Sequence, residues 1–341
     1  MKFFEKRIPI AYALVLAVVC SGLCFFLIRK YTTSAAVASE NSSAMSQQEK
    51  CSYTIARLKG YQYIKPLINE EPECESKEMA SLKQEITTLV DNEKQAGIIQ
   101  SASVYIKEFS SDNWTSINPG EGYLPGSLFK LPVLLTILKM SETDPAILNK
   151  KILFQPEAVV GISQTYESKA IQPGHTYTIK ELLTYMIAYS DNAALQLVNR
   201  NIDPDVLIKI FSDLGLTPPK PDAASYMTYT ITTRDYSIFM AALYNAAYLT
   251  IPNSEYATSL LAKCDFKEGL LKGLPADVKV AHKFGEAGSN QVRELHETAI
   301  VYINNNAYLI TVMTRGNDIK KLAETIAEIS RLTYARMKQS A

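Results

Sequence analysis

The stretch "YLPGSLFKLPVLLTILKM", residues 123–140, places a lysine in the first turn of an otherwise apolar predicted helix. Ser127 precedes Lys130 by three positions, so the two side chains share one helical face, about 5–6 Å apart at Cβ. Pro132 cannot donate a backbone hydrogen bond, and the helix is therefore expected to begin near Ser127. The apolar neighbours of Lys130 predict its partial burial, which lowers the pKa of the amine. A neutral amine here can accept the proton of the Ser127 hydroxyl.

The position of Ser127 at the start of this helix adds a second catalytic feature. Gly126 lets the chain turn sharply just before the serine. The backbone N–H of Ser127 then lies at the positive end of the helix, where it can help to bind a developing oxyanion. The alternative is an ordinary core helix whose lysine snorkels to the surface, because a four-residue pattern is weak evidence by itself.

Two further motifs favour the catalytic interpretation. Ser190-Asp191-Asn192 stands between two predicted helical stretches in 178–200, and the strand-like segment "ADVKVAHKFG" (276–285) ends in Lys283-Phe284-Gly285. Each motif has a second copy in the chain. The "SDN" at 111–113 suits a hairpin turn, and Lys267-Glu268-Gly269 lacks a preceding strand. The order, spacing and context of the motifs are therefore more informative than their letters.

The surrounding pattern predicts one α+β domain over residues 79–341. Helical spacing is found at 79–97 and again at 317–338, and the middle of the domain is mostly helical to about residue 265. Alternating segments predict strands at 101–109, 114–118 and 276–285, with a further strand hairpin over 297–316. We expect an antiparallel sheet flanked by helices beside an all-α lobe, with a site in the cleft between them.

The domain resembles the class A β-lactamases and the related penicillin-binding proteins. The resemblance rests on the order along the chain of the serine, the lysine, "SDN" and a K-x-G at the end of a strand. The likeness is carried by "GSLFKLPV", "YSDNAALQLV", "VAHKFGE" and "TTRDYSIFMAALY". The resemblance implies the β-lactamase/transpeptidase fold and an acyl-enzyme at Ser127, with Lys130 as base or proton relay. It also implies that Ser190 passes a proton to the leaving nitrogen.

The resemblance further implies residues that bind the substrate. Asn192 would bind the substrate amide, and Lys283 would orient Ser190 and attract the substrate carboxylate. The second half of the oxyanion hole would come from the end of the strand, at Glu286 beside Gly285.

The sequence departs from the family pattern at two places. No E-x-x-L-N occurs between "SDN" and "TTRD", and residues 217–231 offer only Asp222 in place of the glutamate that positions the deacylating water. The resemblance therefore implies slow deacylation. Phe284 stands where the family has Thr or Ser, and we expect Arg293 to compensate in binding the substrate carboxylate.

The N-terminus differs in kind from the rest of the chain. Residues 8–28 form an uncharged apolar run that closes at Arg29. At about 1.5 Å per residue this run reaches roughly 30 Å, the thickness of a bilayer core. We expect a single transmembrane anchor in the cell membrane, with residues 1–7 cytoplasmic and the catalytic domain extracytoplasmic. A cleavable signal peptide is the competing interpretation, since "AVA" at 36–38 has the form of a cleavage site.

Two segments connect the anchor to the domain. Residues 29–50 are Ser/Ala-rich and read as a flexible linker, and residues 51–78 as a stalk. Cys51 and Cys74 are candidates for a disulfide outside the membrane, whereas Cys264 is expected to be a buried thiol.

Composition and motifs exclude several other functions. Lys+Arg and Asp+Glu are balanced at 35 each, so no nucleic-acid partner is expected. The three histidines are scattered and no H-E-x-x-H or C-x-x-C is present, so we expect neither a metal nor a cofactor. The sequence leaves the oligomeric state open.

Four functions remain in competition. The first is a membrane-anchored serine hydrolase of class A β-lactamase type that acts on a β-lactam or related amide. The second is a D,D-carboxypeptidase or transpeptidase acting on peptidoglycan stem peptides. The third is a serine amidase or esterase with another substrate. The fourth is a non-catalytic protein of the cell envelope that uses the same cleft for binding.

Overall fold

The sheet that Lys283 belongs to has five antiparallel strands in the order β4-β3-β9-β8-β7. In this computed structural model the strands are β3 (Ser101–Glu108), β4 (Trp114–Ile117), β7 (Lys279–Gly288), β8 (Arg293–Ile303) and β9 (Asn306–Gly316). The structure describes residues 51–155, 165–166, 168–220, 228–289, 291–304 and 306–340. The chain from Tyr53 onward forms one compact unit.

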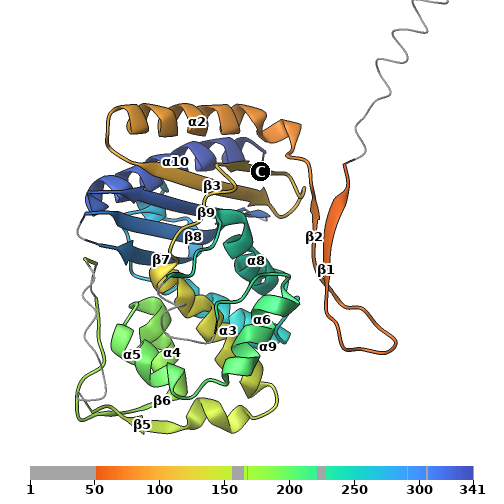
Figure 1. The fold of residues 1–341 in the computed structure, drawn as a ribbon, viewed down its shortest axis with the longest axis vertical. Coiled ribbons are helices and arrows are strands. Elements are labelled where there is room, and N and C mark those ends of the chain that lie inside the picture. The colour runs from red at the N-terminus through yellow and green to blue at the C-terminus, as the bar shows by residue number, and fades with distance from the viewer. Residues whose placement is uncertain are drawn as a thin grey trace, which may run out of the picture. The chain divides into compact units, whose positions relative to one another are not determined.

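Helices cover both faces of the sheet. The terminal helices α2 (Ala80–Gln95) and α10 (Ile319–Ser340) pack side by side on one face (Figure 1). The apolar residues of α2, including Leu82, Ile86 and Val90, recur at helical spacing and are buried in this layer. Helix α8 (Thr233–Tyr244) covers the opposite face, where it contacts β3, β8 and β9.

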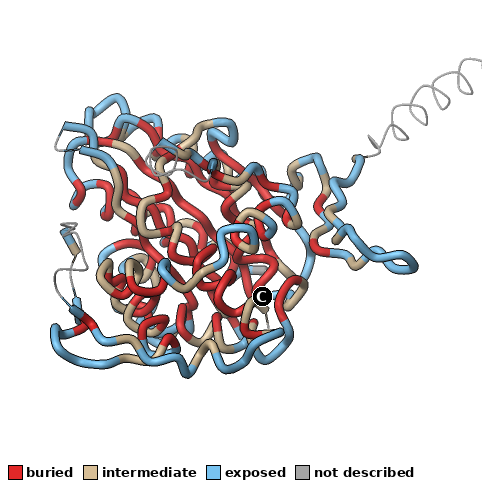
Figure 2. The backbone as a smooth tube through the Cα atoms, turned by 60° about the horizontal axis from the view of Figure 1, so that its bottom comes forward, coloured by how far each residue is buried: buried red, intermediate tan, exposed pale blue. Residues whose placement is uncertain are grey.

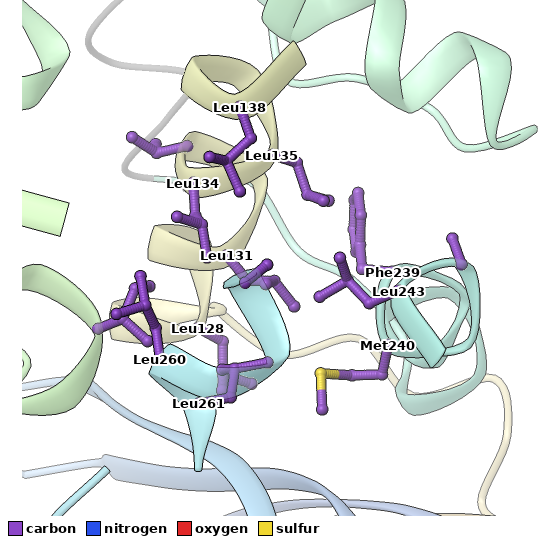
Figure 3. Packing of buried hydrophobic residues seen from close by; sticks show 14 of the residues in the cluster. Leu128, Leu131, Leu134, Leu135, Leu138, Phe239, Met240, Leu243, Leu260 and Leu261 are labelled. Carbon is purple, nitrogen blue, oxygen red and sulfur yellow. The ribbon is translucent and has the colours of Figure 1, made fainter. Parts of the chain in front are cut away.

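On the side of the sheet that α8 covers, further helices form a helical lobe. It consists of α3 (Lys130–Ser141), α4 (Ile179–Ala188), α5 (Asn192–Asn199), α6 (Pro204–Asp213) and α9 (Ile251–Leu261). Helix α3 runs through the middle of this lobe, and its leucines pack against residues of α8 and α9 (Figure 3). Burial of this kind stabilises by about 1.5–3 kcal/mol per large apolar side chain, so α3 is held firmly in place.

These observations confirm the predicted α+β architecture with an antiparallel sheet and an α lobe. Two local predictions need correction. Residues Gly126–Phe129 form a 3₁₀ turn, η2, and the α-helix proper begins only at Lys130. The helical lobe also contains a small two-stranded sheet of β5 (Lys151–Leu153) and β6 (Thr176–Thr178). These strands are too short to show a clear alternation in the sequence.

The segment predicted to be a stalk contains a β-hairpin. Strands β1 (Tyr53–Arg57) and β2 (Leu67–Pro72) pair antiparallel. Figure 2 shows that this hairpin is mainly exposed, whereas buried backbone runs through the sheet and the central helices. Cys51 and Cys74 are both disulfide-bonded, and Cys264 is a free, buried thiol as predicted.

The predicted membrane anchor at 8–28 lies outside the described residues. Within the part of the chain that the structure describes, no helix is both long and apolar enough to cross a membrane.

Candidate active site

The turn η2 presents Ser127 at the entrance to α3. Tyr236 of α8 is completely buried and donates a hydrogen bond from its hydroxyl to the Leu128 carbonyl at 2.8 Å, which fixes the turn from below. Leu128 itself is buried among the leucines at the start of α3 (Figure 3). Tyr236 belongs to the segment "TTRDYSIFMAALY", which resembles the family, but the sequence analysis assigned no role to this residue.

Two glycines allow η2 to lie directly against the end of β7. Gly126 has a φ of +52°, and a Cβ on it would lie 2.1 Å from the Glu286 carbonyl oxygen. A Cβ on Gly285 would lie 2.6 Å from the Pro125 carbonyl oxygen and 2.7 Å from the Leu128 nitrogen. Real atoms do not approach so closely, so both positions require glycine. The glycine of the K-x-G motif therefore brings the strand against the nucleophile's turn.

The "SDN" segment turns its serine toward the same point. Ser190 is a non-glycine residue with a φ of 54°, an uncommon backbone conformation that is often kept at functional sites. Asp191 holds this conformation, because its carboxylate accepts hydrogen bonds from the backbone of Ala193 and Ile171, each at 2.8 Å. Asn192 then begins α5 with its side chain directed into the site.

Lys130 connects the nucleophile to this segment. Its Nζ lies 2.9 Å from Ser127 Oγ, and it contacts the Ser190 carbonyl at 2.5 Å and the Ser190 hydroxyl at 3.0 Å. It also lies 2.8 Å from Asn192 Oδ1. Lys283 reaches Ser190 Oγ from the opposite wall, at 2.9 Å. The structure thus brings together Ser127, Lys130, Ser190, Asn192 and Lys283.

Both lysines have lowered pKa values. Lys130 is 0% exposed, and burial followed by the positive charge of Lys283 lowers its pKa well below the usual value. Lys283 is equally buried, which lowers its pKa to about 8 even though nearby negative groups favour its charge. Burial therefore favours the neutral form of Lys130, whose lone pair can accept a proton.

A buried polar network supports Lys283 from behind. His282 Nδ1 lies 2.6 Å from Glu297 Oε1 on the neighbouring strand, and His282 Nε2 lies 3.2 Å from the Cys264 carbonyl oxygen. Burial opposes the charged form of His282, but Cys264 and Glu297 outweigh it and raise its pKa to about 10. The sequence analysis gave none of these three residues a functional role.

The second K-x-G copy has a structural purpose in this network. The other carboxylate oxygen of Glu297 accepts a hydrogen bond from the Leu270 backbone at 2.6 Å. A Cβ on Gly269 would lie 2.1 Å from that oxygen, so only glycine fits beside the buried carboxylate. This second copy therefore packs around the Glu297 carboxylate of β8 and takes no part in the site itself.

The end of β7 presents Glu286 and, across the strand pair, Arg293. The Glu286 carboxylate accepts hydrogen bonds from the backbone of Thr165 and Tyr166, both at 2.9 Å. Arg293 donates to Thr165 Oγ1 at 2.7 Å and lies 3.6 Å from Glu286. The guanidinium thus already has partners beside the site, and its predicted role in binding a substrate carboxylate stays a prediction.

Phe284 fills a different place from the hydroxyl that the family pattern has here. Its ring stacks on Phe266 at a centroid distance of 4.3 Å, and it is only 3% exposed. Lys283 Nζ lies 4.2 Å from the centroid of the same ring, a geometry that favours a charged ammonium. Where the family pattern has a hydroxyl, this chain therefore has an aromatic ring in contact with Lys283.

His296 belongs to β8, close to the turn that carries Ser127. His296 is buried, and its Nε2 lies 2.9 Å from the Leu124 carbonyl oxygen, a structural contact. No group of His, Cys, Asp and Glu among the described residues is arranged to hold a metal ion. Asp222 lies outside the described residues.

Comparison with known proteins agrees with this geometry. Residues 81–337 match the family described as the beta-lactamase enzyme family. The chain is 23% identical over 258 residues to beta-lactamase OXY-1 of Klebsiella oxytoca, which covers 72% of this chain and 86% of that protein.

Solved structures share the fold. The structure of PBP-A is 22% identical and superposes with a TM-score of 0.63, covering 76% of this chain and 97% of the other. A class A beta-lactamase from Mycobacterium abscessus is 19% identical with a TM-score of 0.63, covering 75% and 99%. The TLA-1 extended spectrum beta-lactamase is 17% identical with a TM-score of 0.66, covering 77% and 100%.

Proposed function

Because this chain belongs to the beta-lactamase enzyme family and is a serine hydrolase that acts through an acyl-enzyme, we propose that Ser127 is acylated by a β-lactam or a related amide. One observation carries this proposal. The Nζ of the buried Lys130 lies 2.9 Å from Ser127 Oγ, within direct proton-transfer distance.

Acylation begins with proton transfer from Ser127 to Lys130. A neutral amine has two N–H groups and one lone pair. It can therefore donate to the Ser190 carbonyl and to Asn192 Oδ1 while its lone pair accepts the proton of the serine hydroxyl. The freed Oγ attacks the substrate carbonyl, and the backbone N–H of Ser127 in η2, beside the Glu286 end of β7, binds the developing oxyanion.

The leaving nitrogen receives its proton through Ser190. The Ser190 hydroxyl lies 3.0 Å from Lys130 and 2.9 Å from Lys283, so it can donate its own proton to the nitrogen and take one from Lys130. Lys283 keeps its charge below pH 8 and attracts the carboxylate of the substrate.

We infer slow deacylation. Among the described residues, the carboxylates whose charge acts on Lys130 are already engaged, since Asp191 accepts from two backbone N–H groups and Glu286 from two others. A carboxylate occupied in this way is a poor base for the hydrolytic water. The same feature supports a second candidate, a D,D-peptidase of the penicillin-binding type that passes the acyl group of a peptidoglycan stem peptide to another acceptor.

The proposal includes attachment to the cell membrane. The apolar run at 8–28 is long enough to span a bilayer, and a disulfide-bonded Cys51 and Cys74 suit an extracytoplasmic location. We place the enzyme outside the cytoplasm on a single N-terminal anchor.

Intact-protein mass spectrometry after exposure to benzylpenicillin tests the function. We expect one stoichiometric adduct that persists over minutes to hours, and no adduct on the folded Ser127→Ala variant. Rapid loss of the adduct with penicillin turnover would contradict slow deacylation. The absence of any adduct on the wild-type chain would contradict acylation of Ser127 by β-lactams. Transfer of the acyl group from a D-Ala-D-Ala peptide to an added amine would favour the peptidase.

A further inference from the structure

The loop that joins β1 to β2 exposes large apolar side chains. We name residues 57–67, "RLKGYQYIKPL", the hairpin tip. Tyr61, Tyr63 and Ile64 of the tip are 56%, 88% and 58% exposed. Such clusters on a folded surface commonly mark a site of interaction, and tyrosine is enriched where one end of a side chain meets lipid and the other meets water.

The charges of the hairpin tip are all of one sign. Arg57, Lys59 and Lys65 surround the apolar side chains, and the tip contains no acidic residue. All three basic residues are exposed. A basic and aromatic surface complements an anionic lipid surface, where each basic residue increases partitioning by roughly fivefold.

The hairpin tip has a defined shape. The Leu58 backbone donates to the Pro66 carbonyl at 3.0 Å, and Arg57 Nη1 donates to the Lys65 carbonyl at 2.8 Å. These bonds close the neck of the tip, so its apolar side chains need little further ordering to bind a surface.

The base of the hairpin is fixed to the domain. Glu71 of β2 is buried and accepts from the hydroxyl of Tyr105, and it pairs with Arg234 at 2.6 Å. Trp114 Nε1 donates to the Pro72 carbonyl at 2.9 Å. The hairpin therefore moves with the catalytic domain, and a contact made by the tip orients the whole domain.

We propose that the hairpin tip docks on the anionic lipid surface of the membrane that carries the chain. This rests on the N-terminal anchor of the proposed function. The anchor at 8–28 is followed by 22 residues, 29–50, before the hairpin begins. An unstructured chain of this length would have a root-mean-square span of about 25 Å, so docking of the tip would be intramolecular.

Docking of the tip would point the active site away from the membrane. The hairpin contacts Tyr105 of β3 and Trp114 of β4, while the catalytic strand β7 is at the other edge of the sheet. Four strand spacings separate β4 from β7, or about 19 Å. The strand that carries Lys283 would therefore lie at the edge of the sheet farther from the hairpin.

A tryptophan at the tip tests this orientation. The chain has one tryptophan, the buried Trp114, so Tyr63→Trp adds a single exposed probe. Val292→Trp, between β7 and β8, is the matched control at the far edge of the sheet. The full chain is reconstituted in vesicles of equal parts phosphatidylcholine and phosphatidylglycerol with brominated acyl chains. We expect at least about twofold stronger quenching at position 63 than at 292. Adding Lys59→Glu and Lys65→Glu should remove the difference.

Flotation of the same vesicles separates this proposal from the anchor. Flotation with equal quenching at both positions would overturn docking and leave the anchor intact. A chain that does not float would refute the anchor, and docking with it. Quenching that survives both glutamate substitutions would overturn the role of anionic lipid. A concentration-dependent blue shift in the fluorescence of the Tyr63→Trp variant in detergent would assign the surface to a second copy of the chain instead.

Discussion

The two walls of the active site each provide one completely buried lysine, and the two lysines share the Ser190 hydroxyl, yet their surroundings are opposite. Lys130 rises from the leucine core of the helical lobe (Figure 3), and the side-chain and backbone oxygens around it are neutral. Lys283 stands on a strand that carries Glu286 and is backed by Glu297. Burial alone therefore does not decide the role of a lysine.

The difference teaches how one site keeps a base and a cation a few ångströms apart. Each lysine is desolvated and each has carboxylates nearby, Asp191 and Glu286 in the case of Lys130, but Lys283 also lies over the Phe284 ring, which stabilises its charge. That charge in turn lowers the pKa of Lys130. The cation on β7 thus helps to make the amine on α3 a base.

The comparison is tested most strongly by replacing each lysine with arginine. Arginine cannot lose its proton, so Lys130→Arg removes the base and should lower the rate of penicillin acylation by about 10³-fold. Lys283→Arg keeps the cation and should cost only about tenfold. Stopped-flow acylation rates measure both effects, and circular dichroism establishes that both variants are folded. Equal losses would mean that the two lysines do not divide the roles.

Removal of the shared hydroxyl is expected to have the next largest effect. Ser190→Gly and Ser190→Ala each break the link between the lysines and should lower acylation by about 10²-fold. The φ of 54° favours glycine, so the alanine variant should be less stable than the glycine variant by about 1 kcal/mol. Acylation kinetics and urea unfolding give the two quantities. A Ser190→Ala variant that acylates at the wild-type rate would remove Ser190 from the proton path.

The pH dependence of acylation reports the charge on Lys283. Its pKa of about 8 means that the cation is present at lower pH and is lost as the pH rises through 8, where kcat/KM should fall. Glu297→Gln removes a carboxylate that favours the cation, and should therefore move this alkaline limb to lower pH.

The control for this measurement is Glu294→Gln. Glu294 is a buried carboxylate on the same strand that bonds to Arg315 at 2.7 Å and to the Leu124 backbone at 2.9 Å. Its substitution should lower stability and leave the alkaline limb in place. Equal shifts in both variants would indicate a general loss of structure.

The smallest effect is expected from Phe284→Leu. Leucine keeps an apolar side chain in the core between the sheet and helices α2 and α10, but it removes the ring that lies 4.2 Å from Lys283 Nζ. The loss of a cation–π contact of about 0.5–1 kcal/mol should lower acylation at pH 8 by two- to threefold. Phe284→Tyr keeps the ring and is the control. A rate unchanged in the leucine variant would assign Phe284 to packing alone.

Most of the fold and the core of the site could be predicted because they depend on local pattern. Helical spacing located α2 and α10, and alternation located β7 to β9. The five residues of the motifs lie within hydrogen-bonding distance of one another through Lys130 and Ser190, and their order and their elements were both visible in the sequence.

The remaining features depend on contacts between distant segments. Glu297 and His282 belong to different strands, and only the pairing of β7 with β8 brings them together. Tyr236 is an ordinary helix residue until α8 packs beneath η2. The hairpin of β1 and β2 consists of short strands whose exposed residues give no clear apolar alternation.

The most direct test of the account is a pH titration of lysine side chains by NMR. The protein carries ¹³C at lysine Cε, and the Lys130→Arg and Lys283→Arg variants assign the two buried signals. We predict that Lys130 loses its charge well below the pH at which an ordinary lysine does, and before Lys283, which titrates near pH 8. A Lys130 signal that stays charged to higher pH than that of Lys283 would contradict the central claim.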